Sequence, residues 1–201
     1  MGDLWARRER VLLQRRLTTL RRVPAIVIPY RGDAKRRLPS SLRAALAVAM
    51  LGDVVEVAAQ VGRVLVVTDD ASVVPSGAEI VADPGAGLGA AVAAGLERVA
   101  GPALVVNADL PAATPDALRR LSEAGLALVE AADGTTNALS LPDPRAFVPV
   151  YGQGSAQRFR AHGFVTTRIP ELELDVDSDA DLERMGARVG PRTRALLAVP
   201  A

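Results

Sequence analysis

Short apolar runs alternate along this chain with longer segments of helical character, and most of the runs end in a polar cluster. Residues 25–28, 64–67 and 103–107 are three such runs. Short, uninterrupted apolar runs are typical of strands that are buried on both faces of a parallel sheet. Their alternation with helices predicts an α/β fold: a three-layer sandwich around a mostly parallel, Rossmann-like sheet.

The remaining elements are expected to follow the same alternation. Further strands are predicted at residues 79–82, 126–129, 137–141 and 165–169. Helices are predicted to begin at Ser40, Leu88, Pro115 and Ser155, and Asp177 or Ser178 should cap one that ends near Met185. Ligands of such sheets bind beyond the carboxyl ends of the strands, so the polar clusters there mark the expected site.

The composition excludes several classes of protein. The formal net charge of this 201-residue chain is +1, so neither nucleic acid nor a membrane is expected as a partner. Because the chain has no cysteine, disulfides and thiol nucleophiles are excluded. We expect one domain over residues 23–201, preceded by a basic N-terminal extension over residues 1–22. Without an apolar run that could serve as a membrane span or a signal peptide, a cytoplasmic location is expected.

The loop after the first predicted strand is basic. It contains Arg31, Lys35, Arg36 and Arg37. Arginine can bind phosphate oxygens in a bidentate manner and lysine acts as a mobile point charge, so this loop suits a triphosphate. Lys35 is the single lysine among 24 basic residues, which indicates that its chemistry is needed. A solvated basic loop is the alternative interpretation.

A glycine-rich segment, residues 83–90, joins a predicted strand to a predicted helix, and its first part, residues 83–88, is called the glycine-rich loop here. Its glycines allow backbone N–H groups to approach an anionic ligand. The pattern Gly85-x-Gly87-x-x-Ala90, with Asp109 about 20 residues later, also meets the dinucleotide-binding fingerprint. A nicotinamide-dependent oxidoreductase is therefore an alternative function, and a nucleotide-binding module without catalytic activity is another.

Three aspartates are candidate metal ligands. Asp109 ends a predicted strand, and it is available for other work because Thr114 can cap the helix that follows. Asp175 and Asp177 are two residues apart, so on an extended strand both side chains share one face. Such carboxylates suit a hard divalent cation, and we expect Mg²⁺ here. The alternative for Asp177 is a helix N-cap.

A second group of polar residues suits the acid or phosphate group of another substrate. Hydroxyl groups, a side-chain amide and glycine N–H groups can all donate hydrogen bonds to an anion. The candidates for this acceptor site are Thr136, Asn137, Gly152, Gly154 and Ser155.

In this order, the motifs resemble those of the guanylyltransferases that make the deazaflavin carrier coenzyme F-420. These belong to the nucleotidyltransferases that include the molybdenum-cofactor enzymes. The resemblance runs from about Pro24 to Leu182 and rests on residues 29–31, 34–38, 43–54, 67–70, 83–88, 108–111, 136–139, 152–155 and 174–177. The chain departs from the family pattern at Gly89, Ala156 and Phe159, where the family has Asn, Phe and His.

The resemblance implies a fold of the nucleotide-diphospho-sugar transferase, or glycosyltransferase-A, type. It also implies Mg²⁺-dependent transfer of GMP from GTP to the phosphate of phosphoenolpyruvate or 2-phospho-L-lactate, with release of pyrophosphate. The implied catalytic residues are Lys35, Arg37 and Asp109. The implied nucleotide contacts are Arg31, Lys35, Thr68, Asp69, Asp83, Gly85, Gly87 and Leu88. The composition, typical of actinobacteria, favours phosphoenolpyruvate.

We predict that Lys35→Arg impairs the enzyme, although arginine is the common cation of this chain. A guanidinium differs from an ammonium in shape and reach, so the triphosphate would be held differently. Steady-state kinetics with the nucleoside triphosphate should show a lower kcat/KM. A variant with the wild-type value would refute the inference drawn from the composition.

Overall fold

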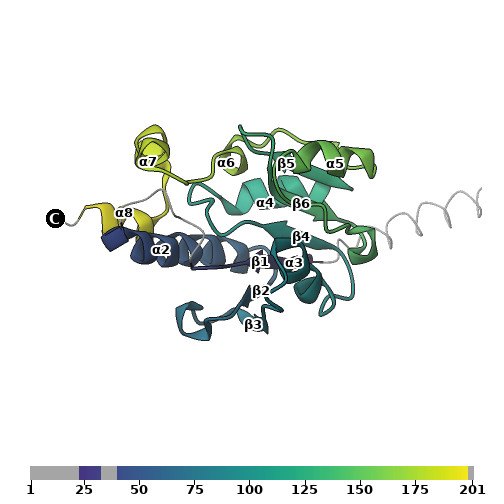
Figure 1. The fold of residues 1–201 in the computed structure, drawn as a ribbon, viewed down its shortest axis with the longest axis horizontal. Helices are drawn as coiled ribbons and strands as arrows, with labels where there is room; N and C mark the ends of the chain where they lie inside the picture. Colours follow the sequence, from purple (N-terminus) through teal and green to yellow (C-terminus); the bar gives the residue numbers. More distant parts are fainter. Residues whose placement is uncertain (1–22, 33–39, 199–201) are drawn as a thin grey trace, which may run out of the picture.

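The structure, a computed structural model, describes residues 23–32 and 40–198 (Figure 1). These residues form a seven-stranded sheet with helices on both faces. The strand order is β3 (Glu79–Ala82), β2 (Arg63–Thr68), β1 (Ala25–Pro29), β4 (Ala103–Val106), β6 (Thr136–Leu141), β5 (Ala127–Glu130) and β7 (Val165–Thr166). The predicted α/β class is confirmed.

The sheet is mostly parallel, as predicted, with β6 as the exception. β6 pairs antiparallel with both β4 and β5, whereas the other strand pairs are parallel. The cause is the short connection after β5, because a tight turn can join only antiparallel strands. Ala131 N–H closes this turn by donating to Thr135 O over 3.0 Å. The start of β6 therefore lies at the edge where the parallel strands end.

Alternate strand residues face the two outer layers. Ile26, Ile28 and Val66 pack in one core cluster with α2 (Ser40–Ala59), α4 (Pro115–Glu123) and α6 (Pro170–Glu173). Val27, Val67 and Val105 pack on the other face with α3 (Leu88–Leu96) and α5 (Ser155–Ala161). Because both faces are covered, the central strands read as continuous apolar runs. The predicted three-layer sandwich is confirmed.

Some element boundaries differ from the prediction. The strand expected at 165–169 is limited to β7, because Ile169 caps α6 and Pro170 occupies its first turn. Ser178, and not Asp177, is the N-cap of α7 (Asp179–Met185), where it forms a capping box with Asp181. Short 3₁₀ helices lie at Ala71–Val73, Pro144–Ala146 and Gly186–Arg188. Among the described residues, no helix has the length and apolar character that a membrane span requires.

A C-terminal helix, α8 (Pro191–Leu197), was not predicted, and the buried Asp53 of α2 anchors it. Asp53 Oδ1 accepts the Arg192 N–H and Oδ2 accepts the Thr193 N–H, each at 2.9 Å. The carboxylate is 3% exposed and caps the start of α8, where free N–H groups and the helix dipole favour negative charge. This contact fastens the end of the described chain to α2.

We predict that Asp53→Asn lowers the free energy of unfolding by about 2 kcal/mol, because the anchor loses its charge and one of its two acceptor oxygens. Glu56→Gln is the matched control on the same helix. Its ion pair with Arg192 spans 3.6 Å and is about half exposed, so little stability should be lost. Denaturant titration of both variants measures the difference, and equal losses would contradict the anchoring role.

Candidate active site

A pocket of about 220 Å³ lies at the carboxyl ends of β1, β3 and β4, next to α2 and α3. Its lining residues are Pro29, Tyr30, Arg31, Ala47, Met50, Asp83, Leu88, Ala91, Asn107, Ala108 and Asp109. Three predicted nucleotide contacts, Arg31, Asp83 and Leu88, therefore share one pocket with Asp109. This is the edge of the sheet where ligands of such folds bind.

Arg31 and Asp83, which both line the pocket, form an ion pair. Arg31 Nε donates to Asp83 Oδ2 over 2.7 Å, and the Gly85 N–H donates to Asp83 Oδ1 over 2.8 Å. The Asp83 side chain is 2% exposed, whereas that of Arg31 is 39% exposed. The Arg31 guanidinium, with a smaller effect from the Gly85 N–H, lowers the pKa of the Asp83 carboxyl. Asp83 thus stays ionised and joins the end of β1 to the glycine-rich loop.

The other predicted nucleotide contacts lie around this pocket or outside the described residues. Thr68 is buried at the end of β2, where its hydroxyl accepts the Asp70 N–H over 3.1 Å, and Asp69 beside it is exposed. Gly85 and Gly87 precede α3. Lys35 and Arg37 lie outside the described residues. The roles of all six residues stay predictions.

Two polar residues of the pocket, Tyr30 and Asn107, were not among the predicted contacts. Burial, and then the charge of Asp70, raise the pKa of the Tyr30 hydroxyl, so it stays protonated. Asn107 Nδ2 donates to Thr136 O over 3.2 Å and ties the end of β4 to the start of β6. The composition could have indicated Asn107: the chain has only two asparagines, and a residue type that is this rare is expected where its chemistry is needed.

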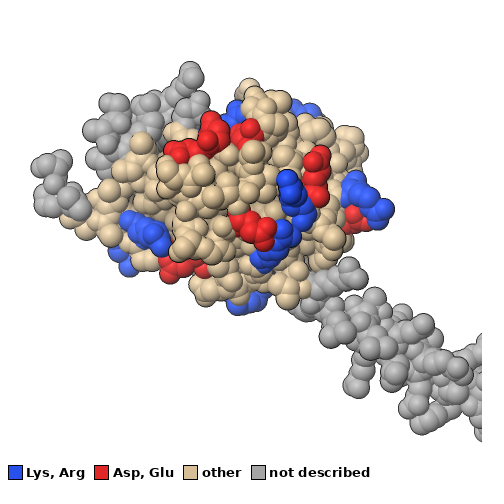
Figure 2. All heavy atoms as spheres, turned by 90° about the horizontal axis from the view of Figure 1, so that it is seen from below, with Lys and Arg blue, Asp and Glu red and all other residues tan. Residues whose placement is uncertain are grey.

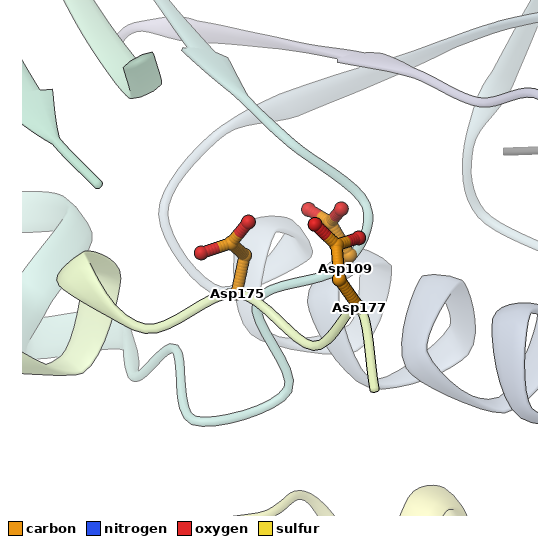
Figure 3. A group of neighbouring side chains, drawn as sticks. All are labelled: Asp109, Asp175 and Asp177. Atoms are coloured by element: carbon orange, nitrogen blue, oxygen red, sulfur yellow. The ribbon is translucent and has the colours of Figure 1, made fainter. Parts of the chain in front are cut away.

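Three carboxylates form a cluster beside this pocket (Figure 3). Asp109 follows β4, and Asp175 and Asp177 lie between α6 and α7. One oxygen atom from each residue lies within 4.8 Å of the others, and all three residues are partly buried. The structure therefore brings together the three aspartates that were predicted to bind metal. Carboxylate oxygens at this spacing fit a hard divalent cation.

The backbone that makes this cluster is not the strand that was predicted. Residues 175–177 belong to no strand of the sheet. Instead, the Val176 N–H donates to Asp109 O over 3.1 Å, and the Val176 side chain is fully buried. In an extended segment the two residues that flank a buried one point the other way, so Asp175 and Asp177 face Asp109.

The predicted acceptor residues divide into buried and accessible ones. Thr136, Asn137 and Ser155 are at most 2% exposed. Their polar atoms bond within the protein: the Thr136 and Ser155 hydroxyls are 2.9 Å apart, and Asn137 Nδ2 donates to Leu172 O over 3.1 Å. Gly152 and Gly154 lie in the loop before α5 and are more accessible. Contact of these five residues with the acceptor stays a prediction.

The first turn of α3, which directly follows the glycine-rich loop, meets the segment before α5 at Gly89 and Pro149. A Cβ atom at Gly89 would lie 2.8 Å from the Pro149 Cβ and 3.2 Å from the Pro149 Cα and carbonyl oxygen. A side chain at residue 89 would therefore force the two segments apart. This contact gives a physical reason for glycine at a position where the resembling family has Asn.

Acidic and basic side chains are interspersed on the face that Figure 2 shows. Exposed ion pairs join Arg63 to Glu79, Arg120 to Glu171 and Arg160 to Glu130 over 2.5–2.7 Å. Such pairs contribute little to stability. The expected absence of a nucleic-acid partner stays a prediction.

Comparison with known proteins identifies related sequences. Residues 47–156 match the model of the MobA-like NTP transferase domain. A phosphoenolpyruvate guanylyltransferase from Geodermatophilus obscurus is 38% identical, and the match covers 87% of this chain and 92% of that protein. The corresponding protein from Streptomyces coelicolor is 36% identical, over 86% of this chain and 95% of its own length.

Solved structures with low sequence identity share the fold. A nucleotidyl transferase from Methanothermobacter superposes with a TM-score of 0.57 at 19% identity, covering 88% of this chain and 98% of that one. The 2-C-methyl-D-erythritol 4-phosphate cytidylyltransferase from Thermus thermophilus gives a TM-score of 0.53 at 18% identity, covering 89% and 100%. A structure described as a nucleotide-diphospho-sugar transferase, from Desulfovibrio desulfuricans, gives a TM-score of 0.64 at 19% identity, covering 87% of this chain and 93% of that one, so the predicted type of fold is confirmed.

We predict that Gly89→Ala raises the KM for both substrates, because the added methyl group would displace the segment at Pro149 from the glycine-rich loop. The protein should stay folded, since alanine favours the first turn of α3 more than glycine does. Initial rates with each substrate varied in turn, together with a thermal melt, test this. Wild-type KM values for both substrates would show that the contact does not shape the site.

Proposed function

The chain belongs to the MobA-like NTP transferases and, within them, to the family of the phosphoenolpyruvate guanylyltransferases, and we propose that it transfers GMP from GTP to phosphoenolpyruvate. The resemblance read from the sequence is thereby confirmed, and the chain is a nucleotidyltransferase. Relatives at 33–38% identity carry the name phosphoenolpyruvate guanylyltransferase, which favours phosphoenolpyruvate over 2-phospho-L-lactate. The product would serve coenzyme F-420 biosynthesis.

One observation carries the proposal: Asp109 belongs both to the pocket and to the carboxylate cluster. A nucleotide bound in the pocket would therefore have its phosphates within reach of Asp175 and Asp177. The acceptor would approach from the side of β6 and α5, where Gly152 and Gly154 lie. The two substrates would meet beside Asp109.

We propose that Asp109, Asp175 and Asp177 hold Mg²⁺. The three carboxylates offer the hard oxygen ligands that this ion prefers, and a protein usually supplies only a few of them. When bound, the ion neutralises negative charge on the phosphate oxygens.

The residues of this chain would bind and orient the substrates. An oxygen of the acceptor phosphate forms a bond to the α-phosphorus of GTP, and the bond between that phosphorus and the bridging oxygen of pyrophosphate breaks. The acceptor phosphate has a second pKa of about 6, so it is largely dianionic at neutral pH and needs no general base. The enzyme therefore has to position the two substrates in line and to neutralise the negative charge of their phosphates. Arg31, Lys35 and Arg37 would supply positive charge, and Gly85 and Gly87 would bring backbone N–H groups near the triphosphate.

The two alternative functions do not fit the family. A nicotinamide-dependent oxidoreductase would use Asp109 to bind a ribose hydroxyl, but Asp109 lies against two further carboxylates. A nucleotide-binding module without catalytic activity would release no pyrophosphate, so the assay for pyrophosphate release distinguishes it from a transferase.

The proposed reaction is tested by incubating the protein with GTP, Mg²⁺ and phosphoenolpyruvate. We expect pyrophosphate release and a GMP–phosphoenolpyruvate product in the mass spectrum. Parallel reactions with 2-phospho-L-lactate, and with ATP or CTP, establish the preferred acceptor and base. If no combination releases pyrophosphate, the proposed function is wrong.

We predict that Asp109→Asn and Asp177→Asn each stay folded and lose turnover by ~10²-fold or more, because the cluster loses negative charge but little volume. The double variant should be little worse than either single variant, since the carboxylates act as one unit. Asp116→Asn, an exposed carboxylate on α4, is the control. Binding of Mn²⁺, followed by calorimetry, should weaken in the cluster variants only. Near-normal turnover of a folded Asp109→Asn enzyme would contradict the assignment.

A further inference from the structure

The loop from Val150 to Gly154, here called the acceptor loop, lies against the exposed side chain of Arg158 and bonds to its guanidinium group. Three nitrogen atoms of this side chain donate to three different backbone carbonyls. Nε donates to Val150 O over 3.1 Å, Nη2 to Tyr151 O over 3.1 Å and Nη1 to Gln153 O over 2.8 Å. Arg158 lies on α5, one turn after Ser155. The helix that begins at the end of the acceptor loop therefore also supplies the side chain that bonds to the loop.

The remaining carbonyl groups of the acceptor loop also accept hydrogen bonds within the protein. Gly152 O accepts the Ser155 N–H over 2.9 Å, and Gly154 O accepts the Arg158 N–H over 3.4 Å. Every carbonyl from residue 150 to residue 154 thus has an internal donor. The loop is in van der Waals contact range of the guanidinium, since a Cβ atom at Gly152 would lie 3.6 Å from Arg158 Nη2. Gly154, at φ 71°, permits the left-handed turn that starts α5.

An aromatic contact also holds the acceptor loop. Phe159, which follows Arg158, packs edge-on against Tyr151 with ring centroids 5.2 Å apart. Phe159 is fully buried and also contacts Phe164 at 5.1 Å. Two consecutive residues of α5 therefore fix the acceptor loop, one through polar and one through aromatic contacts.

This arrangement matters for an anionic substrate. Carbonyl oxygens carry partial negative charge and repel a phosphate or carboxylate, whereas backbone N–H groups attract it. Arg158 engages three carbonyls of the loop and adds a positive charge beside it. A lysine could replace it only in part, because an ammonium group keeps the positive charge but lacks the planar fork that reaches three separate carbonyls.

We propose that Arg158 is a positioning residue for the acceptor: it holds the acceptor loop in the shape that binds the phosphorylated acid. The inference rests on the proposed function, in which this loop faces phosphoenolpyruvate. Arg158 acts through the loop and has no part in the chemistry at phosphorus. Its loss should therefore weaken acceptor binding and leave nucleotide binding intact.

The test compares Arg158→Gln and Arg158→Lys with Arg160→Gln. Arg160 lies on the same helix but bonds to Glu130 and Thr166, away from the acceptor loop. For Arg158→Gln we expect the KM for phosphoenolpyruvate to rise on the order of 10-fold or more, with the KM for GTP within about twofold of wild type. Arg158→Lys should fall between Arg158→Gln and wild type, and Arg160→Gln should keep both KM values.

Thermal melts of all variants accompany the kinetics, and Arg158→Lys carries the test if Arg158→Gln does not fold. An unchanged KM for phosphoenolpyruvate in a folded Arg158 variant would overturn the inference. So would equal rises in both KM values, because they would indicate a general structural role. If wild-type protein does not use phosphoenolpyruvate at all, the proposed function fails instead, which separates the two results.

Discussion

The hydrogen bond from the Val176 N–H to the Asp109 carbonyl joins the segment before α7 to the end of β4. The carboxylate cluster depends on this bond, because it sets two aspartates that come late in the chain against one that follows a central strand. Burial of the Val176 side chain turns Asp175 and Asp177 toward Asp109. A second hydrogen bond, from Asn137 Nδ2 to Leu172 O, joins β6 to α6, the helix that precedes this segment.

The site has two halves that meet at one close contact. The pocket half is built from the ends of β1, β3 and β4, where the buried Asp83 links Arg31 to the glycine-rich loop. The other half is built from the start of β6 and the acceptor loop before α5. The antiparallel direction of β6 brings its first residue to the edge where the parallel strands end. Gly89 allows the two halves to touch at Pro149.

Much of this arrangement could be predicted from the sequence, for physical reasons. Strands buried on both faces appear as apolar runs, so the layers and most of the strands followed from hydropathy alone. Arg31, Asp83, Leu88 and Asp109 could be grouped because sheets of this class bind ligands at the carboxyl ends of their strands. The three metal-ligand candidates were also grouped correctly, although through an expected strand at 175–177 that does not exist.

Other features depend on tertiary contacts that no local pattern shows. The start of α8 is capped by the side chain of Asp53, 139 positions away along the chain, because its own N-cap residue, Gly190, has no side chain that could accept a hydrogen bond. Thr136, Asn137 and Ser155 have polar side chains that suit a ligand, yet these groups bond to one another or to the backbone inside the protein. Arg158 was missed because its partners are backbone carbonyls, which every sequence contains.

The central claim is that Asp109, Asp175 and Asp177 together hold the catalytic divalent cation. Anomalous diffraction from crystals grown with Mn²⁺ and a non-hydrolysable GTP analogue tests this most directly. The account predicts an anomalous peak between the three carboxylates, with the guanine base in the pocket beside Tyr30 and Leu88. A peak bound by other residues, or a nucleotide outside this pocket, would contradict it.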